Sequence, residues 1–259
     1  MNRRDIEYVR YDGINIECRS PQRIESFKIP NLTNADRMFE LTSSLIEANL
    51  GSTTKLESAK EMFRGSSVKK IKMNHLDSLK IGRGMFEHCT ELLSVPFINA
   101  PRLIDAGWMF KKCSSLTTVI LLKIRNLYNA TLMFFGCVNL RTVILGPTPH
   151  LVSCDMMFQD CVNLRRVILM HIPNICSATM MFKNCKNLRY LTINSTFHYL
   201  NGVSDMFLGC ISLPTDIIQR INDSLAPPEV IRCLHLVNNS EITETDDEEE
   251  LNVISVMCT

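Results

Sequence analysis

The residues with the greatest chemical potential in this 259-residue chain are its eleven cysteines and six histidines. Thiolates and imidazoles serve as nucleophiles, general bases and zinc ligands in many proteins. A zinc site needs four ligands around one point, and the chain contains no Cys-x-x-Cys pair. We therefore expect neither a metal nor a cofactor. Most of the cysteines instead share one position of a repeated pattern, which predicts a column of buried free thiols: Cys18, Cys89, Cys113, Cys137, Cys161, Cys185 and Cys210.

One histidine stands where a catalytic pair could form, since His88 precedes Cys89. Equivalent positions of the pattern carry residues as different as Lys112 and Asp160, so we expect an ordinary surface histidine. The Gly-Arg-Gly sequence at 82–84 lacks the remainder of a phosphate-binding loop and predicts a tight turn. The sequence therefore predicts a protein that is not an enzyme.

Charge is distributed unevenly along the chain, although 28 basic and 27 acidic residues leave a net charge of +1. Residues 241–250 read EITETDDEEE, and no lysine or arginine occurs from 241 to 259. Such a segment is typical of a solvated, disordered tail that aids solubility. The alternative is a tail that shields a basic surface or recruits a basic partner.

Nothing in the sequence indicates a membrane span or a secretory signal. No apolar run approaches the ~18 residues that a spanning helix needs, and the opening residues MNRRDIEYVRYDG have no apolar core. An odd number of cysteines without a signal peptide favours a reducing compartment. We expect an intracellular, cytoplasmic protein.

An internal sequence repeat determines the secondary-structure elements in which these residues lie. The dyad Met-Phe occurs eight times, beginning at positions 38, 62, 85, 109, 133, 157, 181 and 206. A cysteine stands four residues after each of the last six methionines, and a leucine follows three residues later. The working consensus is MFxxCxxLxxVxLxxxxxLxxAxx.

The spacing within the repeat predicts two kinds of local structure. LxxVxL ends in the alternation of a short strand with one buried face, whereas LxxAxxMFxxC has the three-to-four spacing of a turn or two of helix. A coil of ~24 residues cannot bury its own core, so neighbouring coils must stack into a solenoid. Its strands then form a parallel ladder with steps of ~4.8 Å.

The pattern LxxVxL followed by LxxAxxMFxxCxxL resembles the BspA-like leucine-rich repeat, in its bacterial-surface-protein form with a Met-Phe dyad. The resemblance covers about four-fifths of the chain. It implies an α/β repeat solenoid, a horseshoe with a parallel β-ladder on the concave face and short helical turns on the convex face. Members are mostly bacterial or protist surface proteins that act in adhesion and binding, and others occur in large DNA viruses.

This resemblance implies a non-enzymatic role in protein–protein interaction, with an unidentified protein partner. The alternative is a surface adhesin that reaches the cell surface without a classical signal. We expect an N-terminal cap over 1–13, about eight to nine repeats over 14–213, a C-terminal cap over 214–240 and the acidic disordered tail over 241–259. Within the C-terminal cap, the sequence predicts a helix with Thr215 as its N-cap and a last strand over 229–237.

A candidate binding face follows from the strand pattern. Residues between the buried strand positions face outward on the concave side, where isoleucines recur with arginines beside them. The predicted face comprises Ile120, Ile144, Ile168, Leu122, Met170, Arg141, Arg165, Arg166, Arg189 and Tyr190. The isoleucines could simply stabilise the ladder, or they could contact a protein partner or a second copy of the chain. A pI near 7.5 and only one aromatic residue on this face argue against nucleic acid.

Overall fold

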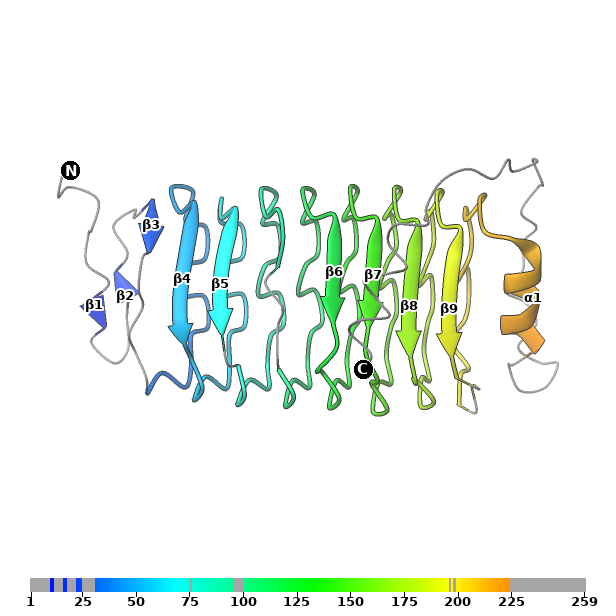
Figure 1. Ribbon diagram of the computed structural model, residues 1–259, viewed down its shortest axis with the longest axis horizontal. Coiled ribbons are helices and arrows are strands. Elements are labelled where there is room, and N and C mark those ends of the chain that lie inside the picture. Colours follow the sequence, from blue (N-terminus) through cyan, green and yellow to red (C-terminus); the bar gives the residue numbers. More distant parts are fainter. Residues whose placement is uncertain are drawn as a thin grey trace, which may run out of the picture.

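Stacked coils of near-constant length build the part of the chain that the structure describes (Figure 1). The structure is a computed structural model, and it describes residues 10–11, 16–17, 22–24, 31–74, 76–95, 100–195, 197 and 199–223. The elements in these residues are β1 (Arg10–Tyr11), β2 (Ile16–Glu17), β3 (Arg23–Ile24), β4 (Glu47–Ser52), β5 (Lys70–Asn74), β6 (Thr118–Leu121), β7 (Thr142–Leu145), β8 (Arg166–Met170), β9 (Tyr190–Asn194) and α1 (Thr215–Asp223).

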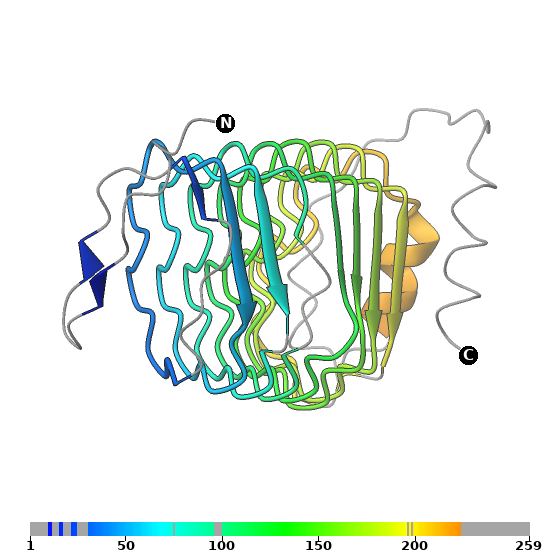
Figure 2. The ribbon, with the colours of Figure 1, turned by 60° about the vertical axis from the view of Figure 1, so that its left-hand side comes forward.

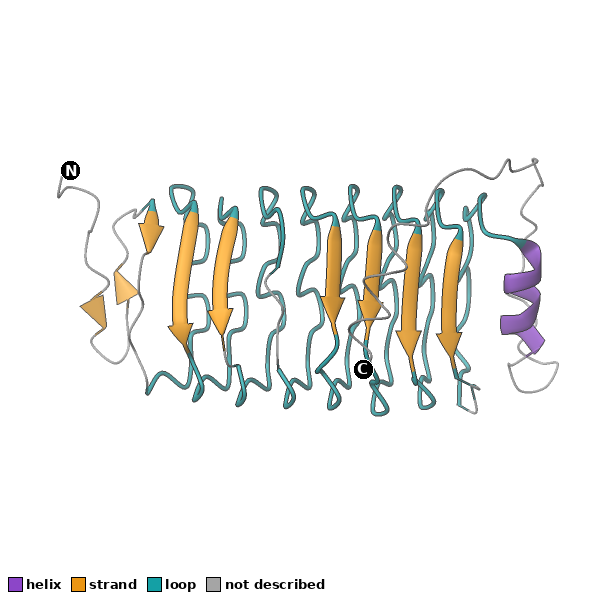
Figure 3. Cartoon of the chain, viewed as in Figure 1, coloured by secondary structure: helices purple, strands orange, loops and turns teal. Residues whose placement is uncertain are grey.

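The strands form parallel ladders on one side of the stack (Figure 3), which we call the strand side. Strands β6 to β9 make one sheet in sequence order, and β3 to β5 make another. The register advances by one repeat at each step, so Val119 pairs with Val143 and Val143 with Val167. The chain is therefore a parallel β-solenoid, as the repeat predicts. Strands β1 and β2 pair antiparallel, outside this pattern.

The other side of each coil, which carries the Met-Phe dyad and the cysteine, is here called the turn side (Figure 2). It consists of hydrogen-bonded turns, and α1 is the only helix among the described residues. The prediction of short helical turns is therefore not confirmed. Single parallel bridges also join successive coils beside these turns, from Asn34 through to Gly202.

The turns differ from a helix because alternate amides bond to the next coil. The amides of Trp108, Phe110 and Lys112 donate to carbonyls of the following coil at 2.7–2.9 Å. The intervening amides of Met109 and Lys111 close turns with the residue three positions earlier. This alternation requires a left-handed backbone immediately before each dyad and three residues after its methionine, as at Trp108 and Lys112, both with φ near +60°. Side chains spaced by three or four are thus buried without helical hydrogen bonds.

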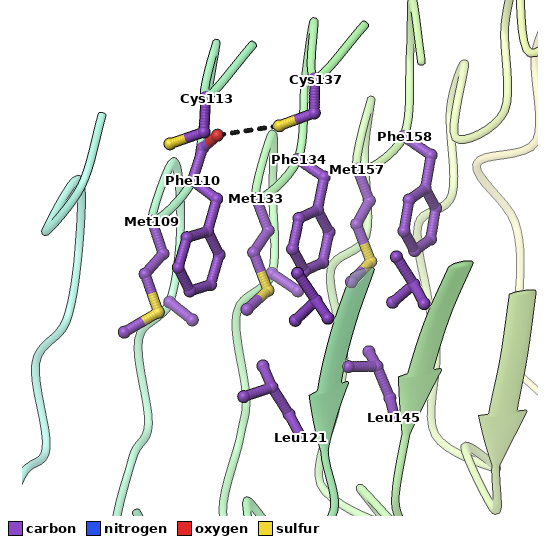
Figure 4. Packing of buried hydrophobic residues seen from close by; sticks show 14 of the residues in the cluster. Met109, Phe110, Cys113, Leu121, Met133, Phe134, Cys137, Leu145, Met157 and Phe158 are labelled. Carbon is purple, nitrogen blue, oxygen red and sulfur yellow. Dashed lines mark hydrogen bonds between the residues drawn. The ribbon is translucent and has the colours of Figure 1, made fainter. Parts of the chain in front are cut away.

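Each consensus position becomes a column of like side chains in the core (Figure 4). The phenylalanines stack along the whole described solenoid, with ring centroids 5.1–5.6 Å apart and planes within 20° of parallel. That distance suits aromatic pairs. The column comprises Phe39, Phe63, Phe86, Phe110, Phe134, Phe158, Phe182 and Phe207. All eight are buried, so the core is continuous from coil to coil.

Helix α1 begins at Thr215, where the sequence predicts a helix, and it buries Ile218 and Ile221. The predicted strand over 229–237, the acidic tail and most of the N-terminal cap lie outside the described residues. The coils follow one another in a single row (Figure 1), and the horseshoe shape that the resemblance implies is not confirmed.

Candidate protein-interaction face

The cysteine column is structural, and its buried thiols form hydrogen bonds between adjacent coils. The Sγ atom of Cys137 donates to the carbonyl oxygen of Phe110 in the preceding coil, at 3.0 Å (Figure 4). The same bond recurs from Cys89 to Cys210 at 2.9–3.0 Å. Burial raises the pKa of the Cys137 thiol to about 12. A thiol so far from ionisation is a poor nucleophile.

Neither His88 nor the described cysteines form a catalytic pair. His88 is exposed on the turn side, whereas the buried Cys89 thiol donates to the carbonyl of Phe63 at 2.9 Å. Burial lowers the pKa of His88, and the adjacent Glu87 only partly opposes this effect. Within the described ranges, no three histidine, cysteine or acidic side chains gather as they would around a metal ion. The described part of the chain also holds no helix of the length and apolarity that crossing a membrane requires.

The three predicted isoleucines lie next to one another on β6, β7 and β8, and we call them the isoleucine row. Ile120 pairs with Ile144, and Ile144 pairs with Ile168. Their neighbours Val119 and Leu121 are buried, as the alternation predicts. Ile120 and Ile168 are half-buried on the outward face of the sheet.

Ile144 departs from the prediction because only 5% of its surface is exposed. It was expected to face solvent like its two neighbours. It pairs with Ile120 on one side and with Ile168 on the other, and Thr142, which shares its outward face on β7, is buried as well. The accessible apolar surface of the row is therefore concentrated on Ile120 and Ile168.

An arginine stands where the chain enters each of β7, β8 and β9, and we call Arg141, Arg165 and Arg189 the arginine row. Backbone hydrogen bonds join them in series, from the Arg165 amide to the Arg141 carbonyl at 2.8 Å and from the Arg189 amide to the Arg165 carbonyl at 3.0 Å. All three are exposed. The ladder thus places one cation per coil along the edge of the face.

Arg166 and Tyr190 come together on the outward face between the two rows. They are paired residues of β8 and β9, and the Arg166 guanidinium lies over the Tyr190 ring, 5.2 Å from its centroid. Such a cation–π contact orients both side chains. Tyr190 is still 49% exposed, so about half of its surface remains accessible.

Leu122 and Met170 extend the apolar surface beyond the isoleucines, and both are half-buried. The intervening coil has Gly146 between them. A Cβ atom on Gly146 would lie 2.4 Å from the Leu122 carbonyl oxygen and 2.8 Å from its Cα. Glycine is therefore required here, because the backbone of Leu122 leaves no room for a Cβ atom.

Basic residues at the beginning of the strand side form ion pairs with carboxylates of the described residues, whereas the arginines near β7 to β9 do not. In the first coils, Arg23 meets Glu47 at 2.9 Å and Lys69 meets Glu91 at 3.0 Å. On β7 to β9, neither the arginine row nor Arg166 forms an ion pair with any described carboxylate. The positive charge of this face is therefore left without a partner among the described residues.

A row of asparagines, which is not among the predicted site residues, stands at the turns that lead into the strands. Asn139, Asn163 and Asn187 each donate a side-chain amide hydrogen to a carbonyl of the preceding coil at 2.8–2.9 Å. The signal was present, because the cysteine is followed by x-Asn-Leu in these three repeats. The row fixes one coil on the next and thereby holds the arginine row in register.

These features define a class of protein, a leucine-rich solenoid with an outward-facing sheet. The sequence matches the family model described as the BspA type leucine rich repeat region over residues 14–141 and 109–225, with six copies. The chain belongs to the BspA-type leucine-rich repeat family. No curated protein matches its sequence.

Two solved structures are similar to the chain. The leucine-rich repeat protein of T. pallidum is 17% identical in sequence, with a TM-score of 0.47. The match covers 80% of this chain and 90% of the T. pallidum chain. The structure of the Toll–Spätzle complex, from Drosophila, shares 19% identity over 74% of this chain and 27% of its own, also with a TM-score of 0.47.

Proposed function

We propose that this chain is a non-enzymatic interaction scaffold that binds a protein partner on the outward face of β6 to β9. The observation that carries the proposal is the isoleucine row beside the unpaired arginine row. An apolar centre with a charged rim is the common anatomy of protein interfaces. The excess of arginine calls for a partner whose own rim is acidic.

The side chains that could do chemistry support a role without catalysis. The described column thiols are buried and hydrogen-bonded, and burial raises the pKa of each of them. We also propose a reducing, intracellular location, because the eight described cysteines are free thiols. Mass spectrometry under non-reducing conditions tests this location, since bridged cysteines in the native protein would favour the surface-adhesin alternative.

Affinity capture with the full chain as bait tests the binding face. We expect the double change Ile120→Lys and Ile168→Lys to lower recovery of an acidic protein partner at least tenfold, because it puts charge at the apolar centre. The matched control, Ile120→Val and Ile168→Val, keeps an apolar surface and should retain the partner. Circular dichroism establishes that both variants stay folded. A partner held equally well by the lysine variant would contradict the assignment of this face.

A second copy of the chain is the other partner that the same face could take. Sedimentation velocity on the wild-type chain and the lysine variant distinguishes it. Self-association that disappears in the lysine variant would identify the partner as another copy.

A further inference from the structure

We propose that residues 241–257 of the same chain dock on the outward face of β6 to β9, so that a protein partner must displace them. These residues lie outside the described part of the chain. The inference rests on the proposed function, because it assigns a regulator to the same face. Three observations carry it: the charge of the face, the order of residues in the segment, and the length of chain that connects them.

The face is cationic and nearly free of acids. The stretches 140–151, 164–175 and 188–198, which contain β7, β8 and β9, include no aspartate or glutamate. The arginine row and Arg166 have no ion-pair partner among the described residues, whereas basic residues of the earlier coils do. Unpaired arginines spaced one per coil favour a ligand that carries several negative charges in a row.

The segment has the complementary composition in a matching order. Residues 241–250 contain seven acids, and the next seven residues read LNVISVM. An acidic stretch followed by an apolar one matches an arginine row and an isoleucine row that lie on the same face, separated by Arg166 and Tyr190. The acidic stretch would face the guanidinium groups, while Val253, Ile254 and Val256 would cover Ile120 and Ile168.

The connection is long enough to allow this docking. The ~18 residues from Asp223 to residue 241 can span up to ~60 Å when extended. The end of the solenoid at α1 is about five coils from β6, or ~24 Å at the spacing of a parallel ladder. For a tether of this length the effective concentration is on the order of millimolar. Even a weak contact would therefore be largely formed within one molecule.

The test uses a fluorescent peptide of residues 241–259, with Cys258→Ser, and two full-length proteins. One is the unmodified chain. In the other, called the tail-neutral chain, the seven acids are replaced through E241Q, E244Q, D246N, D247N, E248Q, E249Q and E250Q. We expect the peptide to bind the tail-neutral chain at least tenfold more tightly than the unmodified chain, whose own segment competes. Raising the salt from 50 to 300 mM should weaken the binding of the peptide to the tail-neutral chain, since charge attraction is screened.

Two further variants of the tail-neutral chain locate the contact. Changing the arginine row to glutamine should weaken peptide binding at least tenfold. The matched control, Arg102→Gln, Lys112→Gln and Lys186→Gln, removes the same charge from exposed turn positions and should leave binding unchanged. Equal binding to the unmodified and tail-neutral chains, or full binding to the arginine-row variant, would overturn the proposal. Dimers of the unmodified chain that vanish when its tail is neutralised would also overturn it, because the segment would then dock on a second copy.

No foreign partner enters this assay, so its failure is separable from failure of the proposed function. If the peptide does not bind but a partner is still lost on Ile120→Lys and Ile168→Lys, the docking segment alone is refuted. If the peptide binds and the lysine changes do not affect partner capture, the proposed function is refuted instead.

Discussion

The thiol of Cys137 and the carbonyl oxygen of Phe110, which belong to adjacent coils, are joined by a hydrogen bond of 3.0 Å. The same oxygen also accepts the amide hydrogen of Cys113 at 3.0 Å. Each cysteine therefore closes a contact between coils as well as filling space. A purely apolar residue of similar size would supply only the packing.

Replacing Cys137 tests that view of the column. Cys137→Ala should lower the free energy of unfolding by ~1–2 kcal/mol, through a small cavity and one lost hydrogen bond. Cys137→Ser should cost less, because its hydroxyl can donate to the same oxygen, and a serine already holds this position as Ser66 in an earlier coil. Urea unfolding measures both. A serine variant less stable than the alanine variant would show that the thiol acts by packing alone.

Alkaline pH should destabilise the solenoid through the same thiols. The unfolded pKa of cysteine is ~8.5, and burial raises that of Cys137 to about 12 in the folded chain. Because the pKa is higher in the folded chain, the neutral thiol contributes fully to the free energy of unfolding below pH ~8.5. That contribution is lost as the pH rises toward 12. Each such thiol should cost ~1.4 kcal/mol per pH unit in that window.

Unfolding at pH 7.5 and 9.5 under reducing conditions measures this loss. Cys137→Ala should lose ~1.4 kcal/mol less than the wild-type chain between the two pH values, since one titrating thiol is absent. Identical pH dependence in the two proteins would mean that the Cys137 thiol does not resist ionisation.

The phenylalanine column should be the most costly place to make a cavity. Phe158 is buried between Phe134 and Phe182, with ring centroids 5.4 and 5.2 Å away. Phe158→Ala should lower the free energy of unfolding by ~3–5 kcal/mol. Phe158→Leu, which fills more of the site, should cost clearly less. A loss below ~1 kcal/mol for the alanine variant in denaturant melts would be incompatible with a packed column.

A glycine at Lys112 should stabilise the chain. Lys112 is exposed and has φ +60°, and the equivalent positions in other coils include Gly65 and Gly136. A left-handed backbone costs a residue with a Cβ atom roughly 1 kcal/mol or more. Lys112→Gly should therefore raise the free energy of unfolding by ~0.5–1 kcal/mol, despite the flexibility of glycine in the unfolded chain. Lys112→Ala keeps the Cβ and should give no gain; a gain with alanine alone would contradict the backbone explanation.

The columns could be predicted from the sequence because a fixed repeat places equivalent residues at equivalent points of every coil. Val119, Leu121, Phe110 and Cys113 are buried for this reason. The turns could not be predicted in the same way. A side-chain spacing of three to four fits a helix and equally well fits the observed turns, which contain residues with a left-handed backbone. Glycines at 65, 84, 136 and 209, all with positive φ, were the available signal.

The face was predicted less completely than the core. The pairing of the isoleucines follows from the repeat, but the repeat gives all three equivalent positions and so does not distinguish the buried Ile144 from its half-buried neighbours. The contact of Arg166 with Tyr190 needs the ladder, because the two residues are 24 positions apart and meet only in register. The lack of ion pairs on this face similarly required knowing where every described carboxylate lies.

The direction of the hydrogen bonds between coils has a mechanical consequence. These bonds, from Phe110 to Met133 and onward, run from each coil to the next. A force that pulls the two ends of the stack apart would load the contacts between coils in series, so the weakest contact in the stack would yield first. Stretching a single molecule should then release coils one after another, each adding a similar length of free chain. Such a molecule would act as an extensible tether that shortens again as its coils restack.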